Sequence, residues 1–296
     1  LIIILSLFNC KSLFYGFNQG IGQLNIIWKA KPLDHYLKDD SYPDSLKSKI
    51  RLINEIKQFA VDSLGIFPSK NYTKMYDQQG IAGMYVVTAC EPYALKSYKW
   101  SFPIVGDFAY KGFFKKRRAV KEVKSLKKDG YDTDIGEVNA WSTLGWFKDP
   151  VMSSMLNKNE GQLASLLIHE LTHSTIFVKN DVQFNENLAS FIGDKGALLF
   201  LQYKYSDNSE IINKYMGELS DLKKIRSHMQ RAAVELKKFY KEYGSSQPKK
   251  RKKEKIQKIL MDMDTLSLNS TLKINRIQAL KETINNTFFT DFLLYR

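Results

Sequence analysis

The chain has 296 residues, of which 44% are hydrophobic and 13% aromatic, and its formal net charge is +14. This composition predicts a folded globular protein with a substantial core and excludes an intrinsically disordered chain. Residues 221–258 hold 14 Lys or Arg against 4 Asp or Glu, and the remainder of the chain is only mildly basic. Because no base-reading fold is visible, the charge does not indicate a nucleic-acid partner.

The first nine residues, LIIILSLFN, are apolar except for Ser6 and Asn9, and Cys10 follows them. The run is too short to span a bilayer but matches the apolar part of a secretory signal peptide. Residues 7–10 resemble a bacterial lipobox, in which the cysteine is lipidated. We therefore expect a membrane-anchored lipoprotein of the bacterial cell envelope, with a signal-peptide remnant at 1–9 and a lipid-anchored tether at 10–20. The alternative is a plain signal peptide with an incidental cysteine.

Hydrophobic periodicity and turn residues predict a mainly helical α+β protein. In chain order, the expected elements are a helix at 44–64 ended by Gly65, a strand at 83–90, strand fragments and turns at 100–114, a charged helix at 115–129, a strand and turn at 136–147, a helix at 160–178, a short connection at 179–183, a second helix at 185–205 and two or three long helices thereafter. We expect the core domain at 21–205 and a basic helical part packed on it at 206–296.

The string HELTH at 169–173 holds two of the four histidines. His169 and His173 are one helical turn apart, so both imidazoles can reach one zinc ion, while Glu170 lies beside the metal as a general base. Cys90 is the only cysteine besides Cys10, which excludes a site built from several cysteines. The alternative is that this string forms an ordinary exposed helix face, but apolar residues on both sides favour a buried helix.

A catalytic zinc site needs a third protein ligand and an open fourth position. Glu186 follows His173 by thirteen residues, at the start of the second expected helix, and the short connection lets that helix fold back. A structural zinc site would instead need a fourth protein ligand. The two other histidines, His35 and His228, lie in charged stretches, where we expect them to be exposed.

Beyond the HELTH string, the sequence VKNDVQFNENLASF at 178–191 resembles that of the predicted zinc aminopeptidases of bacteria, many of which are membrane lipoproteins. Further blocks resemble this family in the same order, and the resemblance covers roughly residues 20–290. They are GQLNIIWKAKPLD, WSFPIVGDFAYKGFF, GYDTDIG, STLGWFKDPVMSSML and INRIQALKETINN.

The resemblance implies a zincin-like fold in which His169, His173 and Glu186 bind zinc. It also implies that Glu170 acts as catalytic base and acid, and that Asn185 supports the site without binding the metal. Relatives tend to have tyrosine at the position of Trp141, so this chain offers no tyrosine hydroxyl there for the oxyanion.

We therefore expect a zinc-dependent peptide hydrolase, an aminopeptidase by resemblance, in which Glu170 activates a zinc-bound water. The alternative is a non-catalytic envelope lipoprotein that binds a partner and keeps a structural zinc site. Several choices stay open at this point. They are Tyr93 or Tyr110 as oxyanion donor, Glu91, Glu137 or Glu160 for binding a substrate amine, residues 138–145 as a substrate-binding or a core strand, and the basic tract 249–255 as a membrane contact or a solvated helix face.

Overall fold

The structure is a computed structural model of the whole chain, and it describes residues 10–102, 106–138, 148–179, 181–206, 209–244, 249–263, 266, 268 and 284–294. The chain divides into two compact units. Unit 1 comprises Leu1–Phe17, Met84–Glu137 and Gly217–Arg296, and unit 2 comprises Asn18–Gly83 and Val138–Met216. Helices α2 (Cys10–Lys29) and α8 (Glu210–Tyr243) each contain a boundary between the units.

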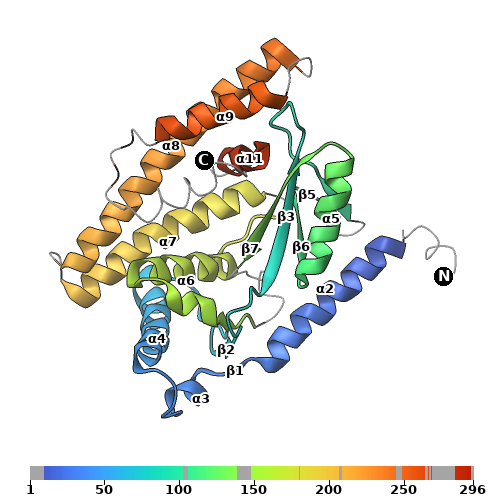
Figure 1. Cartoon of the computed structure of the whole chain (residues 1–296). Helices are drawn as coiled ribbons and strands as arrows, with labels where there is room; N and C mark the ends of the chain where they lie inside the picture. The colour runs from blue at the N-terminus through green and yellow to red at the C-terminus, as the bar shows by residue number, and fades with distance from the viewer. Residues whose placement is uncertain are drawn as a thin grey trace. The chain divides into compact units, whose positions relative to one another are not determined.

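Unit 2 combines a helical core with a small sheet (Figure 1). Its elements are β1 (Lys31–Pro32), α3 (Leu33–Leu37), α4 (Asp44–Leu64), β2 (Lys74–Tyr76), β8 (Val151–Met152), the 3-10 helix η1 (Ser153–Asn157), α6 (Glu160–Thr175) and α7 (Val182–Tyr205). Strand β2 pairs antiparallel with β1 and parallel with β8. Helices α4, α6 and α7 pack on one another, and Phe59 and Phe200 meet edge to face in their core.

The ends of the unit 2 helices follow from local chemistry. Gly65 ends α4 in the left-handed conformation, with φ of 69°, which a residue without Cβ adopts at little cost. Asn159 begins α6, because its side chain accepts a hydrogen bond from the backbone N–H of Gln162 at 2.9 Å. Asp181 begins α7 in the same way, with Phe184 as donor at 2.9 Å.

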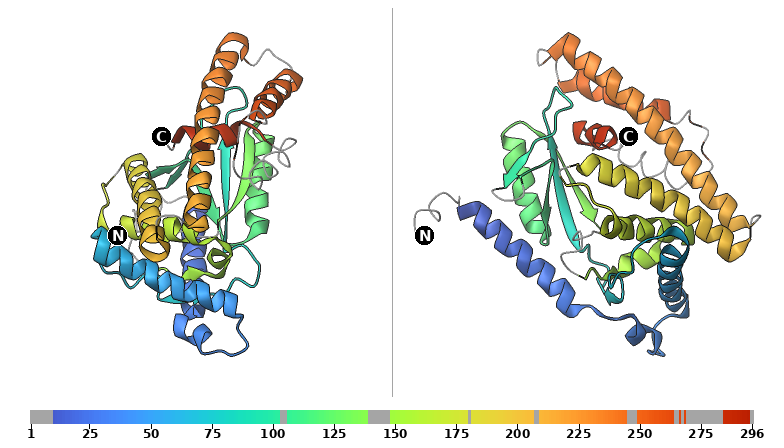
Figure 2. Two further views of the ribbon diagram at one scale, coloured as in Figure 1. Left: turned by 90° about the vertical axis from the view of Figure 1, so that its left-hand side faces the viewer. Right: turned by 180° about the vertical axis from the view of Figure 1, so that it is seen from behind.

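Unit 1 holds a second sheet, a two-stranded hairpin and the C-terminal helices. Its elements are β3 (Met84–Cys90), β4 (Trp100–Phe102), β5 (Gly106–Phe108), β6 (Tyr110–Phe113), α5 (Lys116–Lys128), β7 (Asp132–Val138), most of α8, α9 (Lys249–Met263) and α11 (Asn286–Leu294). The strand order is β6-β3-β7, and α5 packs against β3 and β6. Helices α8 and α9 lie side by side (Figure 2) and share an apolar core with Phe289 of α11.

A buried polar network joins the separate pieces of unit 1. Asn286 is fully buried, accepts a hydrogen bond from the Tyr240 hydroxyl at 2.6 Å and donates one to the Glu91 carbonyl at 2.8 Å. Its backbone N–H donates to Asp132 at 3.0 Å, and the same carboxylate pairs with Lys252. One asparagine thereby connects α8, α9, α11 and the ends of two strands.

The structure confirms the predicted class, since the chain is α+β and mainly helical. The expected strand at 136–147 begins earlier, at Asp132, and Trp141 and most of segment 138–145 lie outside the described residues. The two units interleave along the chain, so they do not follow the expected segments 1–9, 10–20, 21–205 and 206–296; as functional domains those segments stay predictions.

The N-terminal expectations are not tested by the structure. Residues 1–9 lie outside the described part of the chain, and residues 10–20 form the first half of α2. Lipidation of Cys10 and attachment to the cell envelope therefore stay predictions. Among the helices that the structure describes, none is both long enough and apolar enough to cross a bilayer.

Candidate metal centre

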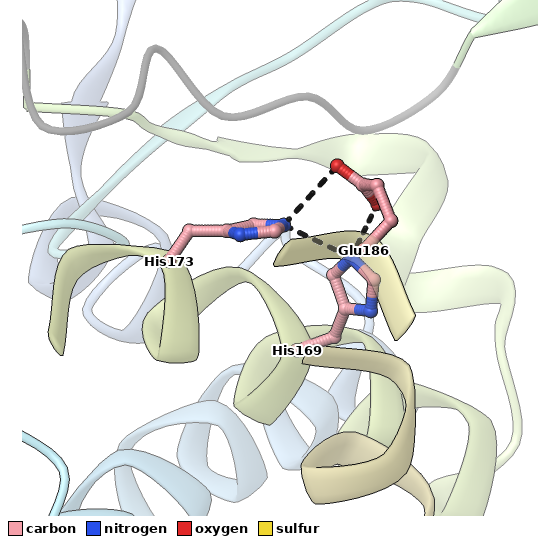
Figure 3. A group of neighbouring side chains, drawn as sticks. All are labelled: His169, His173 and Glu186. Carbon is pink, nitrogen blue, oxygen red and sulfur yellow. Dashed lines mark hydrogen bonds and ion pairs between the residues drawn. The ribbon is translucent and has the colours of Figure 1, made fainter. Parts of the chain in front are cut away.

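His169, His173 and Glu186 lie together at the contact between α6 and α7 (Figure 3). The Nε2 atom of His169 lies 3.2 Å from Nε2 of His173 and 3.3 Å from Oε2 of Glu186. Oε1 of Glu186 lies 3.5 Å from Nε2 of His173. These three side chains are the one group of potential metal ligands found among the described residues. Their donor atoms converge on a single point, as metal binding requires.

The connection between the two helices is fixed by Asn185. Its side-chain oxygen accepts a hydrogen bond from the backbone N–H of Val178, and its side-chain NH₂ donates to the carbonyl of Val178, both at 2.8 Å. Asn185 is buried and directly precedes Glu186. The clamp holds the connecting segment against the first turn of α7 and so determines where the carboxylate of Glu186 lies.

Close helix packing brings the carboxylate within reach of both histidines. A Cβ atom added to Gly193 would lie 2.7 Å from the carbonyl oxygen of Ser165 and 3.1 Å from Cβ of His169. Only glycine fits so close to the backbone of α6. Ser190, one turn after Glu186, lies with its hydroxyl 3.4 Å from Nδ1 of His169. If Nε2 of His169 bound a metal, the ring proton would lie on Nδ1, and the Ser190 hydroxyl oxygen could accept a hydrogen bond from that N–H group.

The environment acts differently on the three potential ligands. Burial lowers the pKa of His169, but the hydrogen bond with Glu186 and the charges of Glu170 and Glu186 outweigh it, so the pKa is raised overall. Burial lowers the pKa of His173, which favours the neutral imidazole that binds metals. The hydrogen bond from His169 lowers the pKa of Glu186 and keeps it ionised. Nδ1 of His173 is buried without a hydrogen-bond partner among the described residues.

Glu170 is 9% exposed and lies next to His169 in the sequence. Burial raises its pKa to about 7, with the nearby charge of His169 acting against the shift and those of Glu186 and Asp149 adding to it. A carboxyl whose pKa lies near neutrality is able to accept and return a proton at physiological pH. This pKa fits the role of general base and acid predicted for Glu170, which stays a prediction.

Tyr72 is a residue that the sequence did not single out. Its backbone has a φ of 58°, which is unusual for a bulky residue, and its side chain is 2% exposed. The hydroxyl has no hydrogen-bond partner in the described part of the chain. Burial, together with the charges of Glu170 and Asp149, raises its pKa well above the usual value. A left-handed tyrosine has no local sequence signal, so only the structure places this hydroxyl near Glu170.

Four other candidate residues belong to the other unit. Tyr93, Tyr110, Glu91 and Glu137 belong to unit 1, whereas the three donors belong to unit 2. Tyr93 packs edge to face on Tyr240, as a core tyrosine does, and Tyr110 is 49% exposed.

Three further candidates are accounted for by local contacts. Glu160 lies nine residues before His169, about 13 Å along the helix, and forms a hydrogen bond with Tyr205. His35 is exposed as expected, whereas His228 is half-buried and contacts the carbonyl of Ile259. None of the three therefore belongs to the cluster of donors.

The sequence pattern of the putative aminopeptidase family matches residues 14–296, nearly the whole chain. The chain belongs to this family. No curated protein and no solved structure gave a match. Membership of this family supports peptidase activity. Among the described residues, the cluster of His169, His173 and Glu186 could hold a metal ion.

Proposed function

We propose that the protein is a zinc-dependent peptide hydrolase that acts as an aminopeptidase. One observation carries the proposal: two imidazole nitrogens and one carboxylate oxygen lie 3.2–3.5 Å apart, beside the buried carboxyl of Glu170. The family match supports the aminopeptidase part of the proposal.

The spacing of the donor atoms fits zinc. Ligand atoms about 2.0–2.1 Å from a tetrahedral zinc ion lie about 3.3 Å from one another. The three measured separations bracket this value. Two histidines and one glutamate also form a donor set that catalytic zinc sites use, because three protein ligands leave a fourth position for a reactant. His169, His173 and Glu186 would therefore hold the ion.

Zinc, when bound, supplies a Lewis acid that polarises a carbonyl group and lowers the pKa of a water molecule. Glu170 accepts the proton of the attacking water and returns it to the leaving amine. Its burial suits this role, because a carboxylate without a hydration shell accepts a proton more readily than an exposed one. Asn185, Gly193 and Ser190 keep the ligands in place by the contacts described above.

The rival function is a binding protein with a structural zinc site. Such a site has four protein ligands, whereas the described residues offer three donors at this centre. The side chains of His169 and Glu186 are 20% and 29% exposed, so the cluster is open on one side. This opening favours the hydrolase.

The test is zinc content together with hydrolysis of aminoacyl substrates and internally quenched peptides by the wild type and Glu170→Gln. We expect both proteins to bind about one zinc ion and the variant to lose roughly 100- to 10,000-fold in turnover. Glu55→Gln removes an exposed carboxylate of α4 in the same unit and should leave both readouts unchanged.

Each outcome decides a different part of the proposal. Zinc binding with no hydrolysis of any substrate would favour the binding protein, and absence of zinc would refute the metal site. Cleavage of internal bonds with little release of N-terminal residues would replace the aminopeptidase by an endopeptidase with the same centre.

A further inference from the structure

Helix α5 of unit 1 has one apolar and one basic side. Ala119, Val123 and Leu126 are buried, on the side where the helix packs against β3 and β6 (Figure 1). The exposed cations of the helix and its first flanking residue are Lys115, Lys116, Arg117, Lys121, Lys124, Lys127 and Lys128. The helix thus joins a sheet on one side and presents positive charge on the other.

Four of these cations form a straight line. Arg117, Lys121, Lys124 and Lys128 follow at intervals of four, three and four residues, which is the spacing of one helix face. The line is about 16 Å long, since each residue of an α-helix adds 1.5 Å. We call these four residues the α5 stripe.

Within α5, no acidic residue stands where it could relieve the repulsion along the α5 stripe. Like charges three or four residues apart destabilise a helix, and no Asp or Glu stands at such a spacing within α5 from any of the four. The single acid of α5, Glu122, accepts hydrogen bonds from Trp100 at 2.8 Å and Lys111 at 3.0 Å instead. The stripe is therefore a concentrated positive charge without an acidic counterpart in its own helix.

The basic tract 249–255 differs, although it is the more obvious in the sequence. In α9, Lys252 pairs with Asp132 and is only 12% exposed, and Lys255 pairs with Glu235. Part of the charge of this tract is therefore used within unit 1 to fasten α9 to its neighbours. In the described part of the chain, no ion pair of this kind involves the α5 stripe.

We propose that the α5 stripe is a docking surface for an anionic lipid bilayer. Lysine and arginine near such a surface gain electrostatic free energy additively, and a straight, evenly spaced line of cations on an exposed helix suits a flat surface of phosphate and carboxylate groups. Binding of single-stranded nucleic acid would need aromatic side chains between the cations for base stacking, and the stripe has none. The lipid predicted on Cys10 would supply the second contact that stable attachment requires.

The test measures binding of the full chain to vesicles of phosphatidylcholine with phosphatidylserine. The stripe variant replaces Arg117, Lys121, Lys124 and Lys128 by Gln, a good helix former. We expect its partition coefficient to fall roughly 100- to 1,000-fold at low salt. Binding of the wild type to these vesicles should weaken with salt, and its binding to pure phosphatidylcholine should match that of the variant.

A matched variant separates position from net charge. Lys223, Lys237, Lys238 and Lys241 are exposed on α8, and their replacement by Gln removes the same four charges from the same unit. This variant should bind vesicles within a few-fold of the wild type. Equal loss in both variants would overturn the proposal, because net charge alone would then explain the binding, and so would an unchanged stripe variant.

Two further measurements complete the test. The thermal midpoint of the stripe variant should equal or exceed that of the wild type, since like-charge repulsion is removed. A lower midpoint together with loss of binding to both vesicle types would assign the effect to misfolding and overturn the proposal. Tighter, stripe-dependent binding to a short DNA duplex or to single-stranded RNA than to the anionic vesicles would show that lipid is the wrong partner.

Discussion

Unit 2 carries 15 Lys or Arg against 15 Asp or Glu, whereas unit 1 carries 30 against 16, so the whole net charge of +14 belongs to unit 1. The neutral unit contains the candidate metal centre, with Glu170 and His173 buried. The basic unit keeps most of its charges at the surface and uses a few to hold helices together. Under the two proposals, charged groups would serve catalysis in unit 2 and attraction to an anionic bilayer in unit 1.

The buried polar groups of the metal centre differ from the polar network of unit 1. In unit 1 Asn286, Tyr240 and Asp132 satisfy one another's hydrogen bonds, which is how a polar core stabilises a fold. In unit 2 the hydroxyl of Tyr72 and Nδ1 of His173 are buried without partners in the described part of the chain. Unsatisfied and pKa-shifted groups are enriched at functional sites. They also occur in unit 1, where the Thr133 hydroxyl is buried without a partner in the described part of the chain and burial raises the pKa of Cys90. In unit 2 they include a residue of the candidate metal centre, His173, and the tyrosine near Glu170.

The largest expected effect comes from removing the carboxylate donor of the candidate metal centre in unit 2. Glu186→Ala should lower zinc affinity by more than about 100-fold, since changes that only touch the surroundings of a ligand already cost 10- to 100-fold. Competition with a chromophoric chelator measures the affinity. Glu55→Ala, an exposed carboxylate of unit 2, should leave it unchanged. Unchanged affinity in Glu186→Ala would remove Glu186 from the metal site.

The polar network of unit 1 should matter for stability and not for the metal. Asn286→Ala leaves the buried Tyr240 hydroxyl and the Glu91 carbonyl without their partner, so it should lower the free energy of unfolding by roughly 2–4 kcal/mol. Denaturant unfolding measures this loss, with the exposed Asn213→Ala as control. A zinc affinity that falls as strongly as the stability would show that the two units are not independent in this respect.

Ionisation of Glu170 should destabilise the metal-free protein. Its pKa rises from 4.5 to about 7 on folding. Its contribution to the free energy of unfolding is therefore greatest below pH 4.5 and is lost as the pH rises through 7. We expect the wild type to lose roughly 3 kcal/mol of unfolding free energy across this range relative to Glu170→Gln. Unfolding in chelator from pH 4.5 to 8 measures the difference. If the unfolding free energies of the wild type and Glu170→Gln changed in parallel with pH, the pKa of Glu170 would not be shifted by folding.

Glu186 provides the control of opposite sign. Its pKa is lowered by the hydrogen bond with His169, so its contribution to stability is present at neutral pH and lost as the pH falls. Glu186→Gln should therefore remove a loss of stability that the wild type shows as the pH falls. Glu170→Gln should instead remove a loss of stability that the wild type shows as the pH rises. The same slope in both variants would contradict the opposite environments described for the two carboxyl groups.

Adding a methyl group at the contact between α6 and α7 should have the smallest effect among these predictions. Gly193→Ala places a Cβ 2.7 Å from the Ser165 carbonyl, so α6 and α7 must separate slightly, at a cost of about 1–3 kcal/mol. Because the shift occurs beside His169, the absorption spectrum of the cobalt-substituted protein should change as well. Gly136→Ala in β7 meets no atom within 4 Å and should leave that spectrum unaltered.

Local patterns predicted much of this protein. The helix at 44–64 ends at Gly65 as expected, and the charged helix expected at 115–129 is observed at Lys116–Lys128. The spacing of four residues between His169 and His173 places them one turn apart in any α-helix. The short connection and the Asn-Glu pair predicted that Glu186 would approach them, as the structure shows. Each prediction depended on residues close together in the chain.

The sequence by itself therefore determined the class of the fold and the three residues of the candidate metal site, because helix periodicity and a short connection are local properties. Only the tertiary structure showed that Gly193 and Ser190 contact His169 and that Tyr72 lies near Glu170. It also showed that part of the basic charge of α9 is paired with acids of other elements, whereas the α5 stripe is exposed. Lys252 meets an acid 120 residues away, and no local pattern encodes such a partner. Burial and pairing depend on which distant segments meet, and folding alone decides that.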